Sequence, residues 1–344
     1  MPNWQKWCSK DSNFEKIKNI KSGIIYGEFS EKIPEYSVLV ITYKRSDGLK
    51  KALDSALNQK TEYPYEIVVL DDSGFDDATD KLMQQYSSQH KNIVYYRNEV
   101  NLGQYNNWNR ACELCRTKWY CLLHDDDMMK PGYLEEMIKV SKKYDDVGLI
   151  GCYLEEIDTR REKKKPISLF VDTFIKLRGK KPIFLTMKDN LKNIFTLSCC
   201  LFINKDKAYE LGGLDDEYYP SSDFVFSAKM NKYYKTIFYP SILCYRGVGE
   251  NESLKQSVCD GSIVCAYELS MQLAKEHGFS QKKSKRKASV AAVIAEIGVK
   301  GYNNVDYGEV KRGLGMKDIY NNKFIIFLIN LYSKFSWGTL LFRR

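Results

Sequence analysis

Histidine is scarce in this chain of 344 residues, which holds three: His90, His124 and His277. Catalytic triads of the Ser/His/Asp kind and many zinc sites depend on histidine. The three lie far apart in the sequence, and none occurs between residues 246 and 253. We therefore expect no hydrolase triad, no zinc site and no histidine ligand from that stretch.

A secretory signal and a disulfide framework are also missing. The first six residues, MPNWQK, contain no apolar core of the kind that directs secretion. The ten cysteines form no pair of CxxC motifs, and several fall in apolar, strand-like runs: Cys121, Cys152, Cys199 and Cys200. We expect buried, reduced thiols and a cytoplasmic protein.

The apolar run near the C-terminus is shorter than the roughly 20 residues that a membrane-spanning helix needs. It covers Phe324–Tyr332 and is followed by Lys334, Trp337 and two arginines at 343–344. Aromatic and cationic residues beside an apolar stripe are typical of a helix lying in the membrane interface, and the basic run at 282–287 favours an anionic inner leaflet. The alternative is a helix that packs on the rest of the protein or at the interface of a homo-oligomer.

No recognisable nucleic-acid-binding module is present, although the formal net charge is +9. A basic surface attracts anionic partners such as acidic lipid or a phosphorylated substrate, and we expect these rather than nucleic acid. Hydrophobic residues make up 44% of the chain and charged residues 28%, which is the composition of a globular protein.

Short apolar runs alternate with helical patterns from residue 36 to residue 154. The alternation predicts strands at 38–42, 67–70, 93–96, 119–123 and 147–154, with helices at 46–59, 77–88 and 105–116 and another opened by Pro131. Such a pattern is typical of a mostly parallel sheet flanked by helices. From 155 to 195 regularity falls and basic residues gather, which indicates an acceptor-facing segment or a plain solvated loop.

Polar clusters follow three of these predicted strands. They are Thr42-Tyr43, Asp71-Asp72 and Asp125-Asp126-Asp127. Ligands bind at the carboxyl ends of the strands in such sheets, so we expect the three clusters to meet at one site. Three adjacent carboxylates repel one another unless a cation or solvent neutralises them, and oxygen ligands suit Mn²⁺ or Mg²⁺ held with a diphosphate. The alternative is a surface acidic turn.

Five segments, taken in order, resemble the family 2 glycosyltransferases of the GT-A fold. They are VLVITYKR (38–45), VVLDDSG (68–74), NLGQYNNWNRA (101–111), LLHDDDMMKPGYLEEM (122–137) and GGLDDEYYPSSDF (212–224). The similarity covers about residues 36–250 and is strongest to bacterial members that assemble capsule, O-antigen or exopolysaccharide repeats. It implies an N-terminal extension at 1–35, a catalytic domain at 36–250 with its nucleotide-binding half at 36–154 and its acceptor half at 155–250, and a helical region at 251–344.

The resemblance implies roles for residues on the donor side. Thr42 and Tyr43 would line the base pocket, Arg45 would bind the donor, and Asp72 would contact the uracil or the ribose. Asn101, Gly103 and Asn109 fall where the family has the turn and helix beneath the diphosphate. Capping of the helix by asparagine is the alternative for these amides.

The acidic run would hold ribose and metal, with Asp125 on the donor and Asp126 and Asp127 on the cation. His124 stands where the family usually has the leading acid of its D-x-D pattern. Which of the three carboxylates touches the metal therefore stays open.

Asp223 occupies the position of the family's catalytic base, and a helix N-cap is its alternative role. Arg246, before a glycine-rich stretch, would neutralise the departing diphosphate. The implied reaction is inverting transfer of a sugar from a UDP-linked donor to a hydroxyl of a saccharide, a lipid-linked saccharide or a glycoprotein. A nucleotidyltransferase and an inactive scaffold docked to the membrane are the competing hypotheses.

Overall fold

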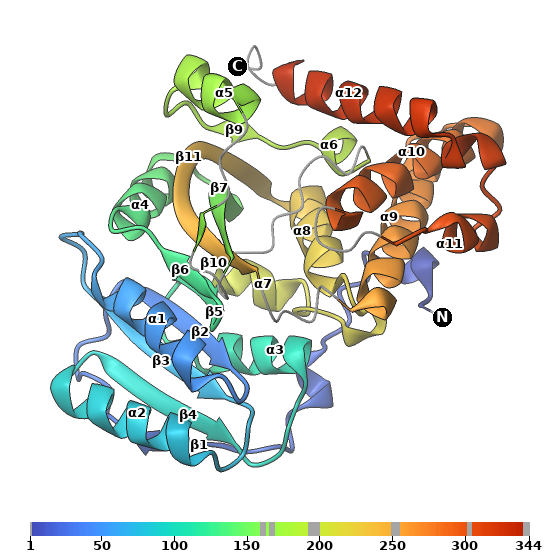
Figure 1. Ribbon diagram of the computed structural model, residues 1–344. Helices are drawn as coiled ribbons and strands as arrows, with labels where there is room; N and C mark the ends of the chain where they lie inside the picture. Colours follow the sequence, from blue (N-terminus) through green and yellow to red (C-terminus); the bar gives the residue numbers. More distant parts are fainter. Residues whose placement is uncertain are drawn as a thin grey trace.

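The structure is a computed structural model that describes residues 2–158, 163–164, 169–191, 200–248, 255–300 and 305–339. One large sheet runs through the molecule with helices on both faces (Figure 1). Its strands, in spatial order, are β1 (Ser22–Tyr26), β4 (Ile93–Asn98), β3 (Tyr65–Asp71), β2 (Tyr36–Thr42), β5 (Trp119–His124), β10 (Leu201–Asn204), β7 (Val147–Asp158), β11 (Lys235–Val248) and β6 (Asp127–Met129). This is the α/β architecture that the sequence predicts.

The first half of the sheet is parallel. β2 pairs with β3 and β5, and β3 pairs with β4. Alternate residues of β2 belong to opposite layers, because Val38 packs with Leu49 whereas Leu39 packs with Trp108. Strands covered on both faces in this way are apolar throughout, which is why their runs are easy to read in the sequence. The helices that cover them are α1 (Ser46–Leu57), α2 (Asp77–Gln89), α3 (Gln104–Leu114) and α4 (Tyr133–Lys143).

The residues that precede β2 pack on the same body. β1 pairs antiparallel with β4 at the edge of the sheet. Phe14 is buried in the layer that contains Trp108, and the Trp7 indole donates to Glu276 near the C-terminal helices at 2.9 Å. The first 35 residues therefore extend the sheet and brace the helical region.

The second half of the sheet is mixed. β10 is antiparallel to β5 and β7, β11 is parallel to β7, and β6 is antiparallel to β11. The expectation that 155–195 lacks regular structure is wrong in the parts that the structure describes. These hold β8 (Lys163–Lys164), α5 (Leu169–Arg178), β9 (Ile183–Phe184) and α6 (Met187–Leu191). β9 and α6 are only two and five residues long, too short to show a periodic pattern in the sequence. Arg160, Arg161 and Lys165 lie outside the described residues.

Helices dominate the C-terminal region, as predicted. α7 (Lys205–Glu210) and α8 (Ser222–Tyr233) precede β11, and α9 (Gln256–Glu276), α10 (Gln281–Lys300), α11 (Gly308–Gly313) and α12 (Lys323–Thr339) follow it. α9 packs against α8 through a cluster that includes Phe224 and Leu269, while Tyr307 and Ile329 belong to a second cluster between the last helices. Among the described residues, no helix is both long and apolar enough to cross a membrane.

Candidate active site

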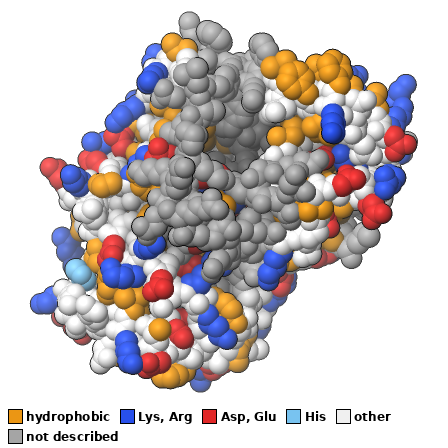
Figure 2. Space-filling model, in the orientation of Figure 1, with side chains coloured by type: hydrophobic (Ala, Val, Ile, Leu, Met, Phe, Trp, Pro, Cys, Tyr) orange, Lys and Arg blue, Asp and Glu red, His pale blue; other side chains and the backbone are white. Residues whose placement is uncertain are grey.

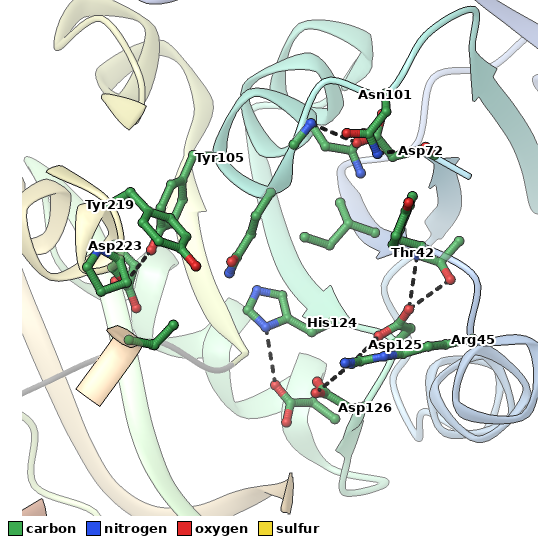
Figure 3. Close-up of a pocket in the computed structure, with 18 of the residues that line it drawn as sticks. Thr42, Arg45, Asp72, Asn101, Tyr105, His124, Asp125, Asp126, Tyr219 and Asp223 are labelled. Carbon is green, nitrogen blue, oxygen red and sulfur yellow. Dashed lines mark hydrogen bonds and ion pairs between the residues drawn. The ribbon is translucent and has the colours of Figure 1, made fainter. Parts of the chain in front are cut away.

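A cavity of about 490 Å³ opens at the carboxyl ends of β2, β3 and β5, where the sequence predicts a site. Figure 3 shows Thr42, Asp72 and Asp125 on one side of this cavity and Asp223 with two tyrosines on the other. All the site residues predicted from the sequence line it, except Asn109: Thr42, Tyr43, Arg45, Asp72, Asn101, Gly103, Asp125, Asp126, Asp127, Asp223 and Arg246. The three polar clusters thus converge as expected.

Asp125 ties the end of β5 to the end of β2. Its carboxylate accepts hydrogen bonds from the Thr42 hydroxyl at 2.8 Å and from the Tyr43 amide at 3.2 Å, and it lies 3.4 Å from the Arg45 guanidinium. Burial and the neighbouring charge of Asp126 nevertheless raise the pKa of Asp125 to about 6. The folded protein therefore stabilises the charged form of Asp125 less well than water does.

Arg45 contacts two carboxylates of this run. One of its nitrogens lies 3.1 Å from Asp126 and also faces Asp125. Because the guanidinium spans two carboxylates, it offsets part of their mutual repulsion. Tyr43, next to it in the sequence, leaves about half of its side chain exposed at the rim of the cavity, where a planar base could stack.

Asp126 and Asp127 lie with His124 in an arrangement that suits a cation. One oxygen of each carboxylate and one imidazole nitrogen all lie within 4.8 Å of one another. Asp127 is buried, accepts from the Gly247 amide at 3.2 Å, and lies 3.8 Å from the His124 Nδ1. Two carboxylates and an imidazole are donors that fit a divalent ion. No role was predicted for His124, although its place at the head of the acidic run was a usable signal.

Asp72 shapes the turn that leads into α3. Its carboxylate accepts from the amides of Leu102 and Gly103, at 2.8 and 2.9 Å, and from the Asn98 side chain. Gly103 has a φ of +76°, a conformation that side chains rarely adopt, and the Asn101 amide donates to the Asp72 carbonyl. Burial raises the pKa of Asp72. This network holds Asn101 and Gly103 at the cavity wall.

Asn109 does not reach the cavity, contrary to its predicted role beneath the diphosphate. Its side-chain nitrogen donates to the Leu214 carbonyl and its oxygen accepts from the Leu214 amide, both at 2.8 Å. The side chain is fully buried between α3 and the loop before α8. Both ends of the amide are therefore engaged, and its role is to hold that loop. It does not cap a helix either.

Asp223 lies in the first turn of α8 and faces the cavity from the side opposite the acidic run (Figure 3). Ser221 takes the N-cap position, so the alternative role of Asp223 as the cap is wrong. Burial raises the pKa of Asp223, and the Phe224 amide, His124 and Arg246 each act in the opposite direction. An acid with a raised pKa is a stronger proton acceptor once it is ionised.

Aromatic side chains surround Asp223. Tyr105 donates to the Pro220 carbonyl at 2.6 Å, and Tyr219 stands against the Tyr105 ring with 54% of its surface exposed. Neither tyrosine was predicted as a site residue, although Tyr219 lies in the segment that carries Asp223. They give this end of the cavity an apolar rim.

Arg246 comes from β11 and borders the end of the cavity that carries the acidic run. Its backbone pairs with Asp127, and its guanidinium lies 4.0 Å from Glu156. The rest of the predicted closing loop, with Gly249, Asn251 and Ser253, lies outside the described residues. Among the described residues of that region, Arg246 lines the cavity.

Comparison with known proteins agrees with this geometry. An uncharacterised glycosyltransferase of Methanocaldococcus jannaschii is 30% identical over 126 residues, which are 36% of this chain and 43% of that protein. The chain thus aligns with less than half the length of this curated relative. A family model described as glycosyl transferase family 2 matches residues 37–212, about half of the chain.

Solved structures share the fold at low identity. S. aureus TarS 1-349 in complex with UDP-GlcNAc has a TM-score of 0.53 at 16% identity, covering 76% of this chain and 81% of that one. The mannosyltransferase PcManGT of Pyrobaculum calidifontis, in complex with GDP-Man and Mn²⁺, has a TM-score of 0.51 at 15% identity, covering 95% and 89%. The fold is that of the GT-A glycosyltransferases, and the chain belongs to glycosyltransferase family 2.

Proposed function

We propose that this protein transfers a sugar from a nucleoside diphosphate donor, UDP-linked, to an acceptor hydroxyl with inversion. The observation that carries the proposal is the placement of Asp223 across one cavity from the run Asp125–Asp127. An inverting transfer needs one carboxylate on the acceptor side and, on the diphosphate side, groups that can hold a cation; Asp223 and the acidic run lie at opposite ends of this cavity.

The donor end is built from groups that suit a nucleotide. Tyr43 and Thr42 border the cavity where the base would lie, and Asp125 would accept from a ribose hydroxyl. Asp126, Asp127 and His124 form the donor set that would hold Mn²⁺ or Mg²⁺. When bound there, a divalent cation stabilises the charge of the leaving diphosphate.

On the acceptor side, Asp223 would take the proton of the attacking hydroxyl. Its raised pKa suits a base that must ionise and then accept a proton. Tyr105 and Tyr219 line the cavity at that end, and Tyr219, which is exposed, offers an aromatic face to a sugar ring. We propose acceptors of the saccharide, lipid-linked saccharide or glycoprotein class, used in the synthesis of a bacterial surface polysaccharide or glycoconjugate.

The competing hypotheses fit these residues less well. A nucleotidyltransferase breaks the bond next to the α-phosphate and has no need of a carboxylate such as Asp223 on the far side of the donor. An inactive scaffold would have no reason to keep Asp125 as a charged and poorly accommodated group.

We also propose that α12 contacts the inner face of the membrane. Phe324, Phe327, Leu328 and Leu331 are exposed at positions i, i+3, i+4 and i+7, whereas Ile329 on the other side of the helix is buried. Figure 2 shows apolar side chains gathered over this helix. Trp337, Arg343 and Arg344, which the sequence adds to this surface, lie outside the residues whose side chains are described. A homo-oligomer interface is the alternative occupant of this face.

The donor proposal is tested by thermal unfolding with a panel of UDP- and GDP-sugars, in Mn²⁺ and in EDTA. A ligand that binds only the folded state raises the free energy of unfolding, by about 2.7 kcal/mol at one hundred times its Kd, and the melting temperature rises with it. We expect a UDP-sugar to stabilise the protein in Mn²⁺ and to do so much less in EDTA. Absence of any nucleotide effect would refute the proposal.

A further inference from the structure

We propose that His124 supplies a nitrogen ligand to the cation at Asp126 and Asp127, and that this nitrogen makes the site prefer Mn²⁺ to Mg²⁺. The inference rests on the proposed function in one respect, that a divalent cation binds there. It goes further by giving the site a mixed nitrogen and oxygen ligand set in place of an all-oxygen one.

The distances support a shared cation better than a direct contact. His124 Nδ1 lies 3.8 Å from an Asp127 carboxylate oxygen, beyond the 2.7–3.2 Å typical of a hydrogen bond. With an Asp126 oxygen included, the three ligand atoms still lie within 4.8 Å of one another. An ion that makes bonds of about 2.0–2.2 Å fits between atoms at this separation.

The imidazole is held in place from outside the cluster. Its ring centroid lies 5.2 Å from that of Trp108, a buried residue of α3, and the backbone of His124 pairs with Ile41 of β2. The other ring nitrogen, Nε2, is buried and has no hydrogen-bond partner among the described residues. No acceptor in that part of the chain therefore competes to turn the ring away from the carboxylates (Figure 3).

The nature of the donor atoms determines the preference. Mg²⁺ takes oxygen ligands in a strict octahedron and usually keeps several waters. Imidazole suits transition metals, whose affinities for a common site rise from Mn²⁺ through Co²⁺ to Ni²⁺. The nitrogen donor therefore weakens Mg²⁺ relative to Mn²⁺. Replacing a carboxylate by a neutral imidazole also removes one negative charge from a crowded site, which lowers the affinity for both ions alike.

Electron spin-echo modulation of full-length protein loaded with Mn²⁺ alone tests the ligand directly. We expect ¹⁴N coupling from one imidazole in the wild type, its loss in His124→Asp, and its retention in the control His90→Gln. The chain has three histidines, so loss of the coupling in His124→Asp, together with its retention in His90→Gln, assigns the signal to His124. The ratio of Mn²⁺ to Mg²⁺ affinity should fall about tenfold or more in His124→Asp.

The wild-type spectrum decides the matter even if the variant does not fold. Bound Mn²⁺ with oxygen ligands alone would overturn the role of His124 and leave the transferase proposal standing. Coupling that persists in a folded His124→Asp would also overturn it. Failure of the protein to bind Mn²⁺ would overturn the inference together with the proposed metal dependence, while UDP-sugar binding in EDTA would show separately whether the donor site exists.

Discussion

Asp125 carries an electrostatic strain that can be measured without substrate. Its carboxylate is buried, stands beside Asp126, and has a pKa raised to about 6 despite hydrogen bonds from Thr42 and Tyr43. In metal-free protein these contacts and the Arg45 guanidinium offset part of the charge. We predict that Asp125→Asn raises the free energy of unfolding in EDTA at pH 7.5.

The magnitude follows from the shift in pKa. The difference between about 6 and the ordinary 3.8 corresponds to roughly 3 kcal/mol, at about 1.36 kcal/mol per pKa unit. Asparagine resembles the uncharged carboxyl and still accepts from Thr42 and Tyr43, but its amide N–H groups face Arg45. We therefore expect a gain of roughly 2 kcal/mol, since a poorly matched polar contact removes about 1 kcal/mol.

The sign of the pH dependence is fixed by the same shift. Because the folded-state pKa is higher than the unfolded one, the folded protein binds more protons between pH 4 and pH 6, and wild-type stability falls as the pH rises through this window. The stabilisation of Asp125→Asn should be complete above pH 7, and near pH 4 the variant should be less stable than the wild type by about 1 kcal/mol, because only the poorly matched amide contact then remains.

Urea unfolding of both proteins in EDTA, from pH 4 to pH 8, gives the measurement. Asp77→Asn, at an exposed carboxylate paired with Lys81, is the matched control and should change stability little. The same Asp125→Asn protein should bind UDP with Mn²⁺ at least about tenfold more weakly, because it loses a charged hydrogen-bond acceptor. A destabilised variant at pH 7.5 would refute the electrostatic reasoning.

Three further outcomes are expected. Asp223→Asn should lower turnover by about 10²–10⁴ while UDP affinity stays similar, and a loss below tenfold in steady-state kinetics would place the base elsewhere. Asn109→Ala should lower the free energy of unfolding by about 1–3 kcal/mol, because the backbone groups of Leu214 lose their partners, and the melting temperature should fall. Its nucleotide affinity, measured by calorimetry, should stay unchanged. Replacing Phe324, Phe327 and Leu331 by serine should release the protein from anionic liposomes in flotation. Substitution of these exposed residues is preferable to deletion of 323–344, because Ile329 belongs to the core between the helices. Wild-type protein that does not bind liposomes at low salt would refute the membrane proposal.

The parallel half of the fold could be predicted because its signals are local and redundant. Runs such as Val38–Thr42 are apolar on both faces, and the residues that follow each strand must lie at one edge of the sheet. That rule brought Thr42, Asp72 and Asp125 together without any knowledge of distance. The site residues that follow strands were therefore placed correctly.

Other residues could not be predicted because long-range partners decide their roles. Asn109 appears as a helix-start amide in the sequence, yet Leu214, 105 positions away, engages both ends of it. β1 is a short, exposed edge strand whose pairing with β4 has no periodic signal. His124 had a usable signal in its place at the head of the acidic run, but its contact with Trp108 and its distance to Asp127 appear only in the structure.

The products formed from the donor test the central claim most directly. Full-length protein is incubated with the UDP-sugar that stabilises it best, with Mn²⁺ and without acceptor, and phosphorus NMR follows the slow reaction. Transfer to water at the anomeric carbon predicts UDP and free sugar, with the rate lost in Asp126→Ala and strongly reduced in Asp223→Asn. Formation of UMP and sugar phosphate, or UDP release that persists unchanged in both variants, would contradict the assignment of this cavity as a glycosyl-transfer site.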